Sequence, residues 1–211
     1  DMVRCQALLL DHLSIDRLFA VTGGSMGGMQ ALEWAVQAPE KVFTAVPIAT
    51  AARHSAQNIA FNEVARHSII SDPSFHAGHY LQNNTYPKQG LMLARMVGHI
   101  TYLSDSAMRA KFGKTVPDFG ATGNNFGRDL RTGKLSFGLN VDFQVESYLH
   151  YQGERFSGNF DANTYLLMTK ALDYFDPSVD YEGNLAKAFA NSGCKFLLIS
   201  FSPVWRFPPE R

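Results

Sequence analysis

Residues 18–36 read LFAVTGGSMGGMQALEWAV, and this stretch decides the fold class. Residues 18–22 form a short apolar run, which is typical of a strand buried on both faces. Apolar residues recur with helical spacing over residues 29–36, and Pro39 ends that pattern. Residues 42–49 form a second apolar run and predict another buried strand. The order strand, helix, strand predicts a parallel α/β sheet.

The turn between the first strand and the helix carries a Gly-x-Ser-x-Gly motif at residues 23–27. Such a sharp turn forces its central residue into strained backbone angles, and we expect Gly23 and Gly27 to relieve the resulting clashes. The turn would present the Ser25 hydroxyl as a nucleophile and the Met26 backbone N–H as an oxyanion donor. A glycine-rich turn with an incidental serine is the simpler alternative. A phosphate-binding loop is excluded, because neither Gly-x-Gly-x-x-Gly nor a Lys-Ser/Thr pair is matched.

The middle of the chain differs from its two ends. We expect a partial core at residues 1–50, a mostly helical lid subdomain inserted at residues 51–192, and a returning core strand with a truncated loop at residues 193–211. The chain begins within a helical pattern and stops soon after a strand, so we expect an incomplete catalytic domain around a complete lid. Helical patterns within the insertion lie at residues 54–70, 91–103, 106–112, 161–174 (with Asp161 as its N-cap) and 184–191. Residues 141–149 fit either a strand or a helix by periodicity.

The composition restricts the class of function. The chain has 19 Lys plus Arg and 19 Asp plus Glu in 211 residues, so its formal net charge is zero. This excludes the basic surface of a nucleic-acid binder. Two cysteines, Cys5 and Cys194, cannot form a disulfide framework, which favours a reducing compartment. Apolar runs are too short for a membrane span, so we expect no membrane partner.

Several long motifs resemble one family. The segment GGSMGGMQALEW at residues 23–34 is very similar to the nucleophile-elbow segment of the homoserine O-acyltransferases, which have the α/β-hydrolase fold. Four further segments, all in the expected lid, resemble that family as well: residues 49–63, 94–104, 145–149 and 160–166. The resemblance covers essentially the whole chain. It implies an α/β-hydrolase fold, and a helix rather than a strand at residues 141–149.

The resemblance also implies a reaction. These enzymes transfer an acyl group, succinyl or acetyl, from acyl-CoA to the hydroxyl of L-homoserine through an acyl-serine, in methionine biosynthesis. Ser25 matches the nucleophile, Arg95 matches the arginine that holds homoserine, and Tyr102 matches an active-site tyrosine. A surface salt bridge is the alternative for Arg95. The family further implies a cytoplasmic homodimer that uses acyl-CoA as co-substrate and needs no cofactor.

The chain departs from the family near its end. The position of the triad aspartate holds Val204, and valine cannot accept the imidazole N–H of a catalytic histidine. The family histidine belongs beyond Arg211. Arg206 resembles the succinyl-using members, because an arginine can pair with the succinyl carboxylate. An exposed arginine at a strand end is the alternative. An inert fragment or pseudoenzyme, or a generic α/β-hydrolase esterase, therefore remains as an alternative function.

The remaining histidines are expected to be structural. We interpret His54, His67, His99 and His150 as hydrogen-bonded core or lid side chains rather than catalytic bases. His76 and His79 have a spacing that could suit a metal, but no carboxylate or cysteine completes a site. The sequence therefore predicts no metal.

Overall fold

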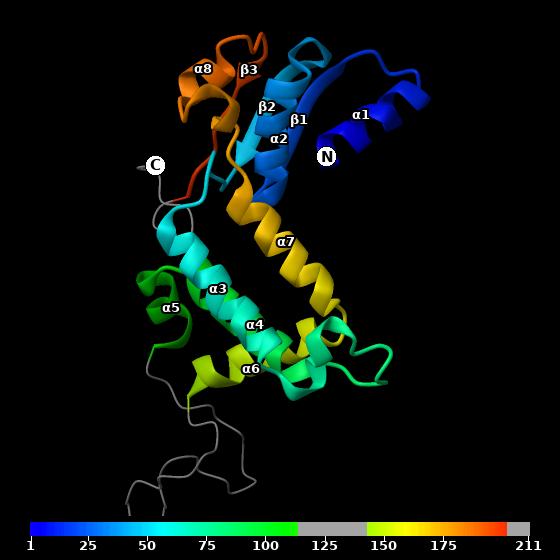
Figure 1. Ribbon diagram of the computed structural model, residues 1–211. Coiled ribbons are helices and arrows are strands. Elements are labelled where there is room, and N and C mark those ends of the chain that lie inside the picture. Colours follow the sequence, from blue (N-terminus) through cyan, green and yellow to red (C-terminus); the bar gives the residue numbers. More distant parts are fainter. Residues whose placement is uncertain (114–142, 202–211) are drawn as a thin grey trace, which may run out of the picture. The chain divides into compact units, whose positions relative to one another are not determined.

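The computed structural model describes residues 1–113 and 143–201. Their contacts divide the chain into two compact units. Unit 1 comprises residues 1–62 and 167–211, and unit 2 comprises residues 63–166. Figure 1 shows the elements of both units. The lid expected at residues 51–192 overlaps unit 2 but has different bounds, and its role as a lid stays a prediction. Among the described helices, none combines the length and the apolar character required to cross a membrane.

Unit 1 contains a parallel sheet in the strand order β1-β2-β3. Strand β1 pairs with β2 from Leu18 opposite Val42 to Gly24 opposite Ile48, and β2 pairs with β3 through Thr44 opposite Lys195. The parallel α/β arrangement expected from the sequence is therefore confirmed. The helical elements that lie wholly within this unit are α1, α2, α8 and the two 3-10 segments η1 and η3. The bounds are α1 Met2–His12, β1 Leu18–Gly24, α2 Met26–Gln37, η1 Pro39–Lys41, β2 Val42–Ile48, η3 Val179–Tyr181, α8 Leu185–Phe189 and β3 Lys195–Phe196.

The core of unit 1 lies between helix α2 and the sheet. Trp34 and Ala35 of α2 pack with Val42 and Ala45 of β2, and all four are buried. The indole N–H of Trp34 donates to Gln6 on α1 at 2.7 Å, so its polar atom is satisfied on burial. This cluster holds the second half of α2 against β2.

The expectation that strand β1 is buried on both faces is wrong. Phe19 is 81% exposed and stacks on Phe43 with ring centroids 5.8 Å apart. Arg17 and Lys195 cover the Phe43 ring by cation–π contacts at 5.6 and 5.1 Å. These long cationic side chains contact Phe43 and leave Phe19 exposed, on a side of the sheet where the sequence pattern alone predicts a buried face.

Unit 2 is helical. Helix α3 (Ala56–Ile70) and helix α7 (Ala162–Tyr174) each begin in one unit and end in the other, and the 3-10 segment η2 (Pro73–Gly78), α4 (Lys88–Tyr102), α5 (Asp105–Phe112) and α6 (Gln144–Ser157) lie within unit 2. The helix predicted by resemblance is confirmed for residues 144–149, and residues 141 and 142 lie outside the described part of the chain. The Glu146 side chain accepts the Phe143 backbone N–H at 2.8 Å, which caps α6 and favours the helix over a strand.

Small residues set the spacing of the unit 2 helices. A Cβ at Gly90 would lie 2.6 Å from the Ser68 backbone oxygen, and a Cβ at Gly153 would lie 3.0 Å from the Met92 backbone oxygen. Helix α4 therefore packs backbone to backbone against α3 and against α6. The core of this unit is completed by buried side chains from α3, η2, the turn after η2, α4 and α7: Ala65, Ile69, Phe75, Tyr80, Leu91, Ala94 and Ala162.

The start of helix α7 is fixed by a buried network. As expected from the sequence, Asp161 caps the helix by accepting the Thr164 backbone N–H at 2.7 Å. The fully buried Tyr80 donates its hydroxyl to the other oxygen of the same carboxylate. Burial acts to raise the pKa of Asp161, but the hydrogen bonds from Tyr80 and Thr164 outweigh it and lower that pKa. Asp161 is therefore a charged cap that joins α7 to the unit 2 core.

Candidate active site

The nucleophile elbow is formed where β1 meets α2 in unit 1. Ser25 is the residue between them and has φ 52° and ψ −117°, a backbone conformation that residues other than glycine rarely adopt. Two hydrogen bonds hold it there. The Ser25 N–H donates to the Ile48 carbonyl at 3.0 Å, and the Thr50 hydroxyl donates to the Ser25 carbonyl at 2.7 Å. The neighbouring strand therefore imposes the strained turn on the serine.

The glycines of the elbow have unequal roles. A Cβ at Gly23 would lie 2.3 Å from the backbone carbon of Gly27, so only glycine fits there. A Cβ at Gly27 would meet nothing within 4 Å. The expectation that both glycines relieve clashes is therefore confirmed for Gly23 and wrong for Gly27. The second restricted position is Gly28, where a Cβ would lie 2.6 Å from the Thr50 side chain.

The elbow presents Ser25 for chemistry. Ser25 is exposed and occupies the N-cap position of α2, yet its side chain does not cap the helix. The hydroxyl is therefore available for attack on a substrate. Met26 is the first residue of α2, and the first amides of a helix have no partner within it. The Met26 N–H and the positive end of the helix dipole are thus the groups at this position that can stabilise an oxyanion.

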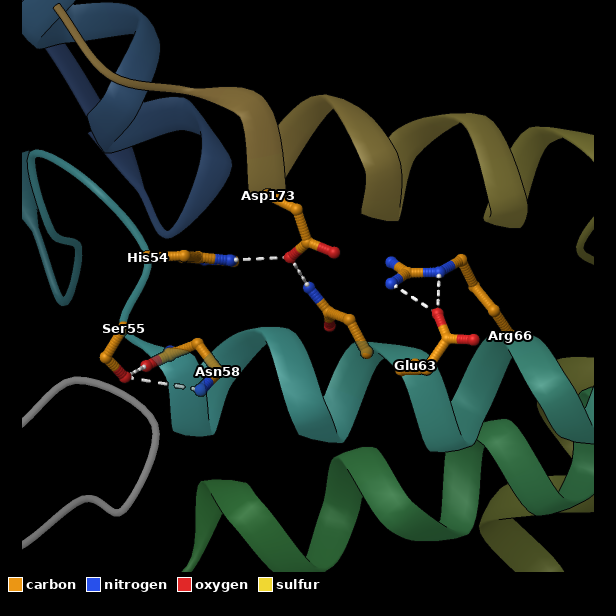
Figure 2. A network of polar contacts seen from close by, with 7 residues as sticks. His54, Ser55, Asn58, Glu63, Arg66 and Asp173 are labelled. Carbon is orange, nitrogen blue, oxygen red and sulfur yellow. Dashed lines mark hydrogen bonds and ion pairs between the residues drawn. The ribbon is translucent and has the colours of Figure 1, made fainter.

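A buried polar cluster follows β2 in unit 1, and Figure 2 shows its side chains. The Nδ1 atom of His54 lies 3.0 Å from the Asp173 Oδ1 atom, and their side chains are 0% and 8% exposed. The Asn62 amide donates to the same Asp173 oxygen at 2.6 Å. The interpretation of His54 as a hydrogen-bonded core histidine is confirmed. Nothing in the sequence spacing identified Asp173 as its partner, because 119 residues separate the two.

Arg95 lies on helix α4 in unit 2 and faces helix α6. Its guanidinium carbon is 4.9 Å from the centroid of the Phe156 ring, a cation–π contact between α4 and α6. Its Nε atom is buried and has no hydrogen-bond partner in the part of the chain that the structure describes. The ion pairs of that part do not include Arg95, so the alternative of a surface salt bridge is not supported.

Tyr102 is seven residues after Arg95 on the same helix, which places the two on one face. Its ring packs edge-on against His99 with centroids 6.0 Å apart, and it is partly exposed. Arg95 and Tyr102 therefore lie on the same side of α4, about two helical turns apart. Both belong to unit 2, whereas Ser25 belongs to unit 1.

His99 lies between Arg95 and Tyr102 on α4 and is held by Tyr148. The His99 Nδ1 atom is 2.8 Å from the Tyr148 hydroxyl. Burial lowers the pKa of His99 below its ordinary value of 6.5, and the positive charges of Arg95 and Lys111 lower it further. His99 is therefore a neutral, structural imidazole at neutral pH, as the sequence predicted for a hydrogen-bonded histidine.

This lowered pKa predicts a pH dependence of stability. The unfolded chain takes up a proton on His99 as the pH falls through 6.5, whereas the folded chain does so only at lower pH. Stability contributed by neutral His99 is therefore present above the unfolded pKa and is lost as the pH falls below it. Urea unfolding between about pH 7 and about pH 5 should show a smaller loss for His99→Gln than for the wild type. The exposed His150→Gln is the control, and equal slopes for wild type and His99→Gln would contradict the prediction.

The fold and the elbow agree with one family profile. The profile of the alpha/beta hydrolase fold family matches residues 1–198. The chain belongs to this family. Within an alpha/beta hydrolase fold, a Gly-x-Ser-x-Gly turn at the carboxyl end of a parallel strand is the position of the nucleophile. This is the position of Ser25 at the end of β1.

Known alpha/beta hydrolase fold proteins resemble the chain closely. It is 60% identical over 211 residues to a homoserine O-succinyltransferase of Acinetobacter baylyi, covering 100% of this chain and 51% of that protein. A homoserine O-acetyltransferase structure from Bacillus anthracis superposes with a TM-score of 0.82 at 22% identity, covering 99% of this chain and 52% of that one. An acetylester hydrolase structure from Corynebacterium glutamicum gives a TM-score of 0.75 at 25% identity, with 98% and 52% covered. The expected resemblance to homoserine O-acyltransferases is confirmed, and the chain spans about half the length of the curated relatives it matches.

Other sequence expectations have different outcomes. His67 and His150 are exposed, and their interpretation as hydrogen-bonded lid or core side chains stays a prediction. Val204 and Arg206 lie outside the described residues. Within residues 1–113 and 143–201, no three His, Cys, Asp or Glu side chains gather in a way that could hold a metal ion.

Proposed function

We propose that the protein is an acyltransferase that moves an acyl group from acyl-CoA to the hydroxyl of L-homoserine through an ester on Ser25. The observation that carries the proposal is the strained, exposed Ser25 at the start of α2, with the Met26 amide beside it. The 60% identity to a homoserine O-succinyltransferase supports the choice of substrates. That relative and Arg206 favour succinyl-CoA over acetyl-CoA as the donor.

The reaction proceeds in two steps. The Ser25 oxygen attacks the thioester carbonyl, and the Met26 N–H stabilises the negative charge that develops on the carbonyl oxygen. The C–S bond then breaks, and coenzyme A leaves as a thiol with the proton given up by Ser25. In the second step the homoserine hydroxyl attacks the serine ester, and its proton returns to the Ser25 oxygen. A general base is required for both proton transfers, and none of the described residues is assigned to that role.

Residues of unit 2 would hold the acceptor. Arg95 is proposed to bind the homoserine carboxylate, because a guanidinium matches a carboxylate with two parallel hydrogen bonds. Its contact with the Phe156 ring holds the guanidinium next to α6. Tyr102, on the same face of α4, is proposed to line the acceptor site. No cofactor is needed by this chemistry, and the homodimer and cytoplasmic location implied by the resemblance remain predictions.

Mass spectrometry of the trapped acyl-enzyme tests the proposal. The protein expressed from its complete reading frame is mixed with succinyl-CoA, quenched in acid and digested. The peptide that contains Ser25 should gain the mass of one succinyl group, and added L-homoserine should remove it. Ser25→Ala should show no such gain. A protein that turns over succinyl-CoA without a label on this peptide, or that releases only succinate when homoserine is present, would contradict the proposed transfer.

A further inference from the structure

Helix α4 and the α6 segment of unit 2 line a polar cavity of about 370 Å³ that is open to solvent. They approach closely where Gly153 of α6 packs on Met92 of α4, and the cavity opens next to this contact. Its lining consists of one α4 residue and residues of the α6 segment, none of them acidic: Arg95, Gln152, Arg155, Phe156 and Asn159. In the sequence its signal is the spacing of Gln152, Arg155 and Phe156, which share one face of α6 at i, i+3 and i+4. Asn159 lies just after the end of the helix.

The cavity wall brings together two guanidinium groups without a carboxylate to neutralise them. Other arginines in unit 2 have an acidic partner, as Arg66 has Glu63 at 2.8 Å and Arg109 has Asp105 at 2.9 Å. Within the described ranges no ion pair involves Arg95 or Arg155. Two like charges beside one cavity repel each other, and an anion between them removes that repulsion.

The geometry of the wall suits a carboxylate in particular. The Arg95 guanidinium carbon lies 4.9 Å from the centroid of the Phe156 ring, and the guanidinium N–H groups form a planar fork that matches the two oxygens of a carboxylate. The Asn159 side-chain nitrogen already donates to the Arg155 carbonyl at 2.9 Å, which leaves the Asn159 side-chain oxygen as an acceptor. The lining therefore offers donors for a carboxylate and an acceptor for an ammonium group, which are the two charged groups of an amino acid.

We propose that Arg155 acts with Arg95 as a two-guanidinium site for the carboxylate of the acceptor amino acid, and so determines specificity. This proposal rests on the proposed function, since it assigns a second residue to the homoserine carboxylate. Arg155 is exposed and lines the cavity together with Arg95, so ligand binding orders its guanidinium beside that of Arg95.

Kinetics with two acceptors test the role of Arg155. One acceptor is L-homoserine, and the other is 3-aminopropan-1-ol, which is homoserine without its carboxylate. In the protein from the complete reading frame, Arg155→Gln should raise the KM for L-homoserine by about 10-fold to 100-fold. The KM for succinyl-CoA and the rate with 3-aminopropan-1-ol should not change. Arg155→Lys should recover part of the loss, because it keeps the charge but not the fork.

The control is Arg109→Gln, which removes the same charge from the same unit at an exposed residue outside the cavity. An unchanged homoserine KM in Arg155→Gln, an equal change in Arg109→Gln, or a rise in the succinyl-CoA KM instead would overturn the assignment. The rate at which L-homoserine removes the succinyl label from Ser25 separates this result from failure of the proposed function. Removal that is equally fast in the wild type and in Arg155→Gln overturns the role of Arg155 alone, whereas a wild-type protein that gains no label on Ser25 overturns both.

Discussion

Gly23→Ala is expected to destabilise the protein by at least about 3 kcal/mol and to abolish the reactivity of Ser25. The added Cβ would lie 2.3 Å from the carbon and 2.4 Å from the oxygen of the Gly27 carbonyl. Both are backbone atoms in the first turn of α2, so no side-chain rotation can relieve the clash. The turn must open, and the Ser25 backbone then loses the angles that present its hydroxyl.

Gly27→Ala is the matched control for this prediction. It makes the same chemical change four residues away, where the added Cβ meets nothing within 4 Å. Alanine is also the better helix former by about 1 kcal/mol, so this variant should be as stable as the wild type or slightly more stable. Urea unfolding and the rate of Ser25 labelling by a fluorophosphonate are measured for both variants. Equal effects of the two substitutions would contradict the unequal roles assigned to the glycines.

The fold and the elbow could be predicted because their signals are local. An apolar run, a glycine-bounded serine and a helical period lie within residues 18–36, and each restricts the backbone directly. The parallel pairing of β1 with β2 follows from the helix between them. The motif alone, however, treats Gly23 and Gly27 as equivalent. Only the three-dimensional path of the turn shows that the Gly27 backbone lies where a Cβ at residue 23 would be.

The parts that could not be predicted depend on distant segments. The Phe19 ring belongs to an apolar run, yet it is exposed and stacks on Phe43, which Arg17 and Lys195 contact from other segments. The cavity beside Arg95 likewise requires α6, which lies about fifty residues further along the chain. Resemblance indicated Arg95 as a carboxylate-binding residue. It did not indicate Arg155, because its contribution depends on how α6 packs against α4.

Asp173→Ala is expected to lower the stability of unit 1 by about 3 kcal/mol or more. One oxygen of this carboxylate lies 3.0 Å from the His54 ring nitrogen and accepts the Asn62 amide at 2.6 Å. The His54 side chain is fully buried and Asn62 nearly so, which means that water cannot easily replace the lost acceptor. The cluster joins the segment after β2 to the start of α3 and to α7, so its loss should loosen these connections together (Figure 2).

Hydrogen exchange and urea unfolding measure this effect. Asp180→Ala, which removes the same charge from an exposed residue of unit 1, is the control and should change stability by less than about 0.5 kcal/mol. In Asp173→Ala the amides of residues 49–62 and 167–174 should exchange faster, whereas the sheet amides of β1 and β2 should keep their protection. Asp173→Asn should fall between the two, because its amide oxygen still accepts a hydrogen bond but carries no charge. If Asp173→Ala unfolds at the same urea concentration as Asp180→Ala, the cluster does not hold these segments together.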